Sequence, residues 1–250
     1  MTKHSTKSLN ERGESHRVAP APKAPLLDLS TTYDHENPVT ARVYTFLDGT
    51  FEMGYTCGSK GRKSHKKFDQ DADGDHQTLS RARSAVRRLV LSLPGKAFLT
   101  LTYADNQTDY KAAKADLQAF VRRCRHKYGK FPHVAVAETQ KRGAWHWHIV
   151  LDGFYPYQEI RELWTHGFID IRKVSNPRKA ANYIGKYLTK TFKTKWPARE
   201  PRYLRSRNIE VNTKQLSFKS TAEAKEYFYK LTDGIYSYEW EENGNGFITN

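Results

Sequence analysis

The sequence lacks long apolar runs and has only two cysteines. Cys57 and Cys124 lie far apart and outside any Cys-x-x-Cys pair, so they form no zinc-binding motif and are typical of a reducing cytoplasm. No stretch approaches the ~18 apolar residues of a membrane-spanning helix, and the first residues lack the apolar core of a signal peptide. These absences predict a cytoplasmic protein without a membrane partner.

Acidic residues are scarce relative to basic ones. The chain has 42 Lys and Arg against 27 Asp and Glu, which gives a formal net charge of +15. Basic side chains placed against phosphates release condensed counterions, so this excess favours a nucleic-acid partner over an anionic membrane or a merely soluble basic protein. A phosphate-binding P-loop is also lacking, because Gly61-Arg-Lys-Ser64 does not have the required spacing.

The order of apolar patterns predicts an α+β fold. Residues 41–56 indicate a hairpin around Asp48-Gly49, and 79–93 a basic helix. Strands over 96–103, 131–138, 144–151 and 167–174 alternate with helices over 110–128, 157–166 and 178–191. This pattern predicts a central antiparallel sheet with flanking helices, of ferredoxin-like or RRM-like type. The domains expected are a flexible basic tail (1–35), an accessory hairpin and helix (36–92), a catalytic domain (93–195) and a C-terminal extension (196–250).

A His-Trp-His motif lies in the middle of an apolar strand. Alternate strand residues share a face, so His146 and His148 project together while Trp147 points the other way. Two strand histidines alone are more often a surface pair than a metal site. Glu138 changes the balance, because the short turn brings it back beside them. Two imidazoles and a carboxylate suit a divalent ion with open positions, Mn²⁺ or Mg²⁺, although nitrogen ligands suit Mg²⁺ less well.

A second motif, Tyr183-Ile-Gly-Lys-Tyr-Leu-Thr-Lys190, lies on a predicted helix. Tyr183 and Tyr187 are spaced i and i+4 and therefore share one face. Such pairs commonly serve packing, and packing stays open for Tyr187. A positioned tyrosine can attack a phosphodiester that a metal ion polarises, and Lys186 is placed to stabilise a phenolate or the developing charge.

In these residues the chain resembles the HUH (His–hydrophobe–His) endonucleases, and among them the rolling-circle replication initiators of plasmids and small single-stranded DNA phages. The resemblance covers roughly residues 80–210. It rests on Phe98-Leu-Thr-Leu-Thr-Tyr103, on Glu138 with His146-Trp-His148, and on the two-tyrosine motif, in the initiator order. The basic run Arg202-Tyr-Leu-Arg-Ser-Arg207 is similar to a segment that follows the tyrosines in those proteins.

The resemblance implies an HUH nuclease core and a site-specific single-strand endonuclease and strand transferase. Tyr183 or Tyr187 would attack the origin phosphate, form a 5′-phosphotyrosine and free a 3′-OH primer, with single-stranded or hairpin origin DNA as substrate. A host helicase and a host polymerase are the implied partners, because the chain has no Walker motif. Relaxases carry their tyrosine ahead of the histidines, unlike this chain. The predicted DNA-binding residues are Arg81, Arg83, Arg87, Arg88, Lys190, Arg202, Arg205 and Arg207.

Two other functions stay open. A single-strand transposase of the HUH class would use the same site, and flanking subterminal hairpins in its DNA would favour it. A non-enzymatic nucleic-acid-binding protein would account for the charge and the aromatic residues. The sequence does not determine the oligomeric state, the origin sequence or which tyrosine attacks first.

Overall fold

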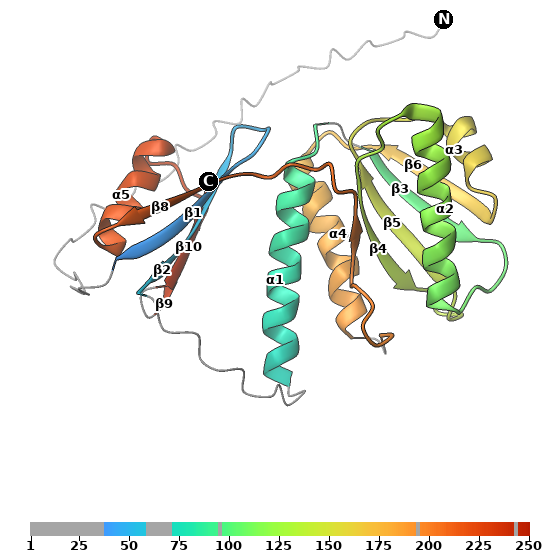
Figure 1. The fold of residues 1–250 in the computed structure, drawn as a ribbon, viewed down its shortest axis with the longest axis horizontal. Coiled ribbons are helices and arrows are strands. Elements are labelled where there is room, and N and C mark those ends of the chain that lie inside the picture. Colours follow the sequence, from blue (N-terminus) through green and yellow to red (C-terminus); the bar gives the residue numbers. More distant parts are fainter. Residues whose placement is uncertain (1–37, 59–71, 95–96, 194–195, 243–244) are drawn as a thin grey trace, which may run out of the picture. The chain divides into compact units, whose positions relative to one another are not determined.

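The computed structural model describes residues 38–58, 72–94, 97–193, 196–242 and 245–250; for 72–77 it describes the backbone alone. Within these ranges the chain folds into two antiparallel sheets and five helices (Figure 1). The α+β class predicted from the sequence is therefore confirmed. The predicted tail, residues 1–35, lies outside the described residues. No helix in the described ranges is both long and apolar enough to cross a membrane.

The first sheet carries the motifs identified in the sequence. Its strand order is β6-β3-β5-β4-β7, and every neighbouring pair is antiparallel. The strands are β3 (Ala97–Tyr103), β4 (His133–Thr139), β5 (Trp145–Leu151), β6 (Gly167–Lys173) and the short β7 (Leu204–Arg205). The four predicted strands are confirmed, whereas β7 has only two residues and too little pattern to be predicted.

Helices cover both faces of this sheet (Figure 1). On one face, α2 (Tyr110–Tyr128) and α3 (Tyr157–Leu163) bury Trp147, Leu99 and their neighbours in a large apolar core. On the other face, α1 (Ala72–Leu91) and α4 (Pro177–Phe192) pack over Val134, Val136 and Val150. Since neighbouring residues of a strand face opposite ways, the apolar run of β5 divides its side chains between two cores.

The helix boundaries follow from local signals. The side chain of Asp109 accepts from the backbone N–H of Lys111 at the start of α2, and Gly129 ends that helix with φ 77°. Asn176 caps α4 in the same way, with Pro177 in its first turn. The prediction for 110–128 is confirmed. Helix α1 begins at Ala72, earlier than the predicted residue 79, and α3 ends at Leu163, short of the predicted 166.

The second sheet combines segments from both halves of the chain. The predicted hairpin forms β1 (Val39–Thr45) and β2 (Phe51–Cys57), turning at Gly49 with φ 80°. In the order β8-β1-β2-β10-β9 it is joined by β8 (Asn212–Phe218), β9 (Tyr238–Glu242) and β10 (Asn245–Thr249). Helix α5 (Thr221–Leu231) packs Ala224 and Phe228 on this sheet. The 196–250 segment, for which the sequence predicts no elements, thus completes the sheet that the hairpin begins.

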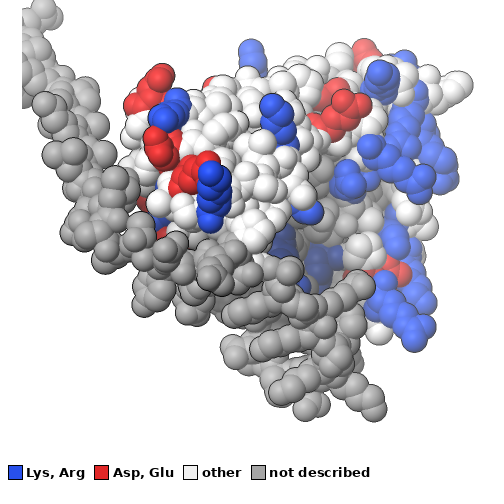
Figure 2. Space-filling model, turned by 60° about the vertical axis from the view of Figure 1, so that its left-hand side comes forward, with Lys and Arg blue, Asp and Glu red and all other residues white. Residues whose placement is uncertain are grey.

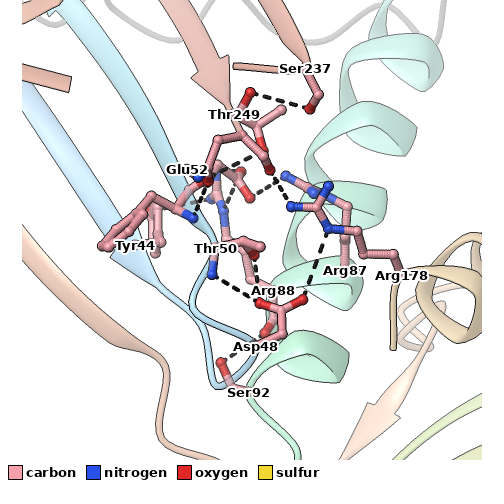
Figure 3. A network of polar contacts seen from close by, with 12 residues as sticks. Tyr44, Asp48, Thr50, Glu52, Arg87, Arg88, Ser92, Arg178, Ser237 and Thr249 are labelled. Atoms are coloured by element: carbon pink, nitrogen blue, oxygen red, sulfur yellow. Dashed lines mark hydrogen bonds and ion pairs between the residues drawn. The ribbon is translucent and has the colours of Figure 1, made fainter. Parts of the chain in front are cut away.

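A buried carboxylate connects this second sheet to α1. Glu52 of β2 has no exposed surface, and its two oxygens form ion pairs with Arg87 and Arg88 of α1 (Figure 3). The guanidinium of Arg88 also lies 3.9 Å from the centre of the Tyr44 ring. Because a buried charge without partners is costly, these contacts fix how the end of α1 meets β2.

Candidate active site

The strand register brings the three predicted metal ligands onto one face of the first sheet. Glu138 of β4 lies directly opposite His146 of β5, and His148 follows two residues along on the same side. Trp147 lies on the opposite face, in the core under α2. The imidazoles of His146 and His148 are nearly parallel, with ring centroids 5.0 Å apart.

The Glu138 carboxylate contacts two basic side chains. Its Oε2 lies 2.8 Å from Nε2 of His148, and its Oε1 accepts from the ammonium of Lys190 on α4. Burial raises the pKa of Glu138, but the hydrogen bonds from His148 and Lys190 outweigh it and hold the pKa below its usual range. The group is therefore a carboxylate at neutral pH, available as an anionic ligand.

His146 is held from both sides of its ring. Its Nε2 lies 2.8 Å from Oγ1 of Thr102, and its Nδ1 lies 3.0 Å from the amide nitrogen of Gln140. The Gln140 oxygen accepts from Arg142, which orients the amide so that its NH₂ faces the imidazole. Burial, with a smaller contribution from His148, lowers the pKa of His146 to about 4. The imidazole is thus neutral at pH 7, as a ligand must be.

The two tyrosines of α4 lie over this face. The Tyr187 ring stacks on the His148 imidazole with centroids 3.4 Å apart, and its hydroxyl donates to that of Tyr183 at 2.7 Å. Tyr183 packs edge-on against Phe98 and is 46% exposed. Burial and the hydrogen bond to Tyr183 raise the pKa of Tyr187. Of the pair, Tyr183 is the more open to a substrate.

The donor set suits a divalent cation in kind. Two neutral imidazoles and a carboxylate provide three ligand side chains, and Glu138 Oε2 and His148 Nε2 are already 2.8 Å apart. Adjacent ligands of an ion with metal–oxygen distances of about 2.1 Å lie about 3 Å apart. Within the described ranges, no three His, Cys, Asp or Glu side chains are yet gathered closely enough to hold an ion. His146 would have to release Thr102 or Gln140 to complete the site.

The lysines of the tyrosine motif differ in their surroundings. Lys190 contacts Glu138 and lies 5.1 Å from the centre of the Tyr187 ring, so it belongs to the site itself. Lys186 is exposed one turn earlier, and in the described part of the chain no acidic side chain pairs with it. The sequence motif assigned the stabilising role to Lys186, and that role stays a prediction.

The predicted DNA-binding arginines lie in different environments. Arg87 and Arg88 pair with Glu52, which gives them a structural role, while Arg81 and Arg83 lie earlier on α1. Arg202 donates to the backbone of Thr191 and lies against the Phe192 and Trp196 rings. Arg205 and Arg207 are exposed. Contact of any of them with DNA stays a prediction.

Sequence reasoning did not select Thr102, Gln140 or Trp196. Thr102 lies opposite His146 in the β3–β5 register, a relationship that depends on a pairing between distant segments. Trp196, Trp145 and Lys193 line a cavity of about 210 Å³ that borders Glu138 and Lys190. A tryptophan beside the tyrosine helix was the only signal for this cavity in the sequence.

Comparison with known proteins agrees with this geometry. Residues 96–192 match the family model for replication-associated proteins of the ORF2 and gene 2 protein type, and they include four strands of the first sheet, both histidines and both tyrosines. The match supports a Rep-like, replication-associated protein. No curated protein and no solved structure matches the chain. The matched residues fall inside the predicted catalytic domain, 93–195, and leave the second sheet unmatched.

Proposed function

We propose that this protein is a replication initiator that nicks one strand of origin DNA with a tyrosine and later rejoins it, as in rolling-circle replication. One observation carries the proposal. The hydrogen-bonded hydroxyls of Tyr183 and Tyr187 lie over the face that holds His146, His148 and Glu138. A structural tyrosine pair would not require a neutral histidine pair and a carboxylate beneath it.

The reaction exchanges one phosphodiester for another. The Tyr183 oxygen forms a bond to the phosphorus, the bond from phosphorus to the 3′ oxygen breaks, and the phenol proton is transferred, through solvent, to the departing 3′ oxygen. The products are a 5′-phosphotyrosine and a 3′-OH primer, so rejoining needs no ATP. Glu138, His146 and His148 would hold Mn²⁺ or Mg²⁺, which as a Lewis acid would polarise the phosphate oxygens.

Tyr187 supports the first attack in this scheme. Its hydroxyl donates to the Tyr183 oxygen, so it stabilises negative charge on that oxygen, and its own raised pKa disfavours its ionisation. Lys190, beside Glu138, adds a positive charge near the phosphate. Once Tyr183 carries DNA, the hydrogen bond is lost and Tyr187 is free to act in a second cleavage.

The partners follow from the products. A 3′-OH end needs a polymerase, and displacement of the parental strand needs a helicase, so we propose that both come from the host. The substrate is single-stranded or hairpin DNA, because a nick in an exposed strand lets tyrosine and phosphate approach without opening a duplex.

Trapping of a covalent adduct tests the proposal. A pooled library of single-stranded stem-loop oligonucleotides is incubated with the full chain and Mn²⁺, and tryptic peptides are analysed by mass spectrometry. We expect a nucleotide mass on the peptide that holds Tyr183, and its loss in Tyr183→Phe and His148→Ala. DNA binding without an adduct in any library member would favour the non-enzymatic alternative. Cleavage confined to hairpins from the ends of a mobile element would favour a transposase.

A further inference from the structure

We propose that Phe168 is a stacking platform for a base of the single DNA strand that enters the candidate active site. The inference rests on the proposed function and names how the same site holds its substrate. Phe168 is the second residue of β6, the edge strand of the first sheet, and is 69% exposed. A phenylalanine on the solvent side of an edge strand contributes little to the fold.

The register places Phe168 in line with the metal-ligand candidates. Phe168 lies opposite Thr102, Thr102 opposite His146, and His146 opposite Glu138, so the four form one row across four strands. Side chains of directly paired residues project to the same face. With strands about 4.8 Å apart, Phe168 lies about 10 Å from His146 along that row, within reach of bases that flank a bound phosphate.

The alternation along β6 identifies Phe168 as the exception. Ile169 and Ile171 face the core of α2 and α3, whereas Phe168, Asp170 and Arg172 are exposed on the opposite side. Asp170 and Arg172 are the polar residues expected on a solvated face, and they pair with each other at 2.8 Å. Helix α4 packs its apolar side on β4 and β5, so the β6 part of the face stays open.

The backbone holds Phe168 in a fixed place. Gly167 has φ 153°, and an added Cβ would lie 2.4 Å from the backbone of both Ala104 and Thr102, so only glycine fits there. The Ala104 N–H bonds the His166 carbonyl, and the Trp164 indole donates to the Thr102 carbonyl. A rigid aromatic side chain loses little freedom when it binds, which favours affinity.

A nucleobase is the ligand that fits these features. Every base has a flat π face, and stacking on an exposed ring binds single strands without regard to sequence. The exposed Arg172 guanidinium on the same strand side supplies a phosphate contact. Basic side chains also gather on one side of the surface in Figure 2, with few acidic ones among them. In a duplex the bases stack on one another, so this platform selects single strands.

The test measures binding without chemistry. Fluorescence anisotropy in EDTA compares the full chain and its variants on a labelled single-stranded oligonucleotide of mixed sequence and on the matching duplex. We expect Phe168→Ala to weaken single-strand binding roughly 5- to 150-fold, the range for loss of one stacked base, and to leave duplex binding unchanged. Phe168→Trp should restore binding, whereas Phe168→Leu, apolar but not flat, should not.

Phe154→Ala is the matched control, because Phe154 is also exposed, at 56%, but lies after the far end of β5. Equal affinities for Phe168→Ala and Phe154→Ala would overturn the inference, as would recovery in Phe168→Leu. Its failure is separable from that of the proposed function. A Tyr183 adduct with unchanged Phe168→Ala binding rejects the platform alone. Weakened Phe168→Ala binding without any wild-type adduct rejects the nuclease alone.

Discussion

The hydroxyl of Tyr187 donates a hydrogen bond of 2.7 Å to the hydroxyl of Tyr183. A donor to the attacking oxygen stabilises its anionic form, and a hydrogen bond to a charged group is worth about 1.5–3 kcal/mol. We therefore expect Tyr187→Phe to slow adduct formation roughly 10- to 100-fold while the adduct stays on Tyr183. Quenched time courses on a denaturing gel give the rate. Tyr157→Phe, an exposed tyrosine of α3, is the control, and an unchanged Tyr187→Phe rate would contradict this role.

Lys190 competes with a cation for the Glu138 carboxylate. The ion pair is partly exposed, at 57% for the lysine side chain, so it contributes only about 0.2–1 kcal/mol. We expect Lys190→Met to bind Mn²⁺ roughly two- to fivefold more tightly in the absence of DNA, as measured by the free Mn²⁺ signal in electron paramagnetic resonance. Lys186→Met removes the same charge one turn away and should leave the Mn²⁺ affinity as it is. Weaker Mn²⁺ binding by Lys190→Met would argue against a competing role.

Glu52 neutralises two arginines inside the protein. Removing the charge in Glu52→Gln leaves Arg87 and Arg88 half-buried beside a neutral amide, and breaking a buried pair costs about 3–5 kcal/mol. The loss should appear as a lower urea midpoint, or as an earlier separate transition of the second sheet. Glu226→Gln, which breaks the exposed i, i+4 pair with Lys230, should cost under ~0.5 kcal/mol. Similar losses in the two variants would show that Glu52 is not structurally special.

Acid should destabilise the fold through His133. Burial lowers the pKa of this histidine in β4, while in an unfolded chain it titrates near ~6.5. Below that pH the unfolded chain binds a proton that the folded chain does not, so stability falls as the pH drops from ~6.5 towards the folded pKa, by up to about 1.4 kcal/mol per unit.

Urea titrations at pH 7.5 and 5.5 measure this loss. His133→Asn keeps a donor for the Phe131 carbonyl and should reduce the difference between the two pH values by about 1 kcal/mol. The exposed His126→Asn on α2 is the control and should retain the full difference. A pH dependence that is the same in both variants would assign the effect to other groups.

The sequence predicted the parts of the site that local periodicity determines. The period of two in β5 places His146 and His148 on one face, and the short turn after Thr139 returns Glu138 to that face. The spacing of Tyr183 and Tyr187 places them on one helix face in the same way. These relationships involve residues of one strand, one hairpin or one helix, so the pattern contains them.

Relationships between distant segments were not predictable in this way. Whether Lys186 or Lys190 reaches Glu138 depends on how α4 is rotated over the sheet, which the packing of Ile184 and Leu188 decides. Arg87 and Arg88 look like a basic helix surface until the partner Glu52, 35 residues earlier, is known. Phe168 belongs to an apolar-looking strand, and its exposure follows from β6 being an edge.

The pairing of β2 with β10 has a consequence for how the protein is made. The first sheet uses strands from residues 97–205, whereas β2, complete at Cys57, meets its neighbour only when residues 245–249 have been synthesised. Domains generally fold as units during synthesis. The first sheet can therefore assemble on the ribosome while β2 still presents a bare edge. Until Thr249 leaves the exit tunnel, that edge is open to other chains, and release from the ribosome is the step at which it closes.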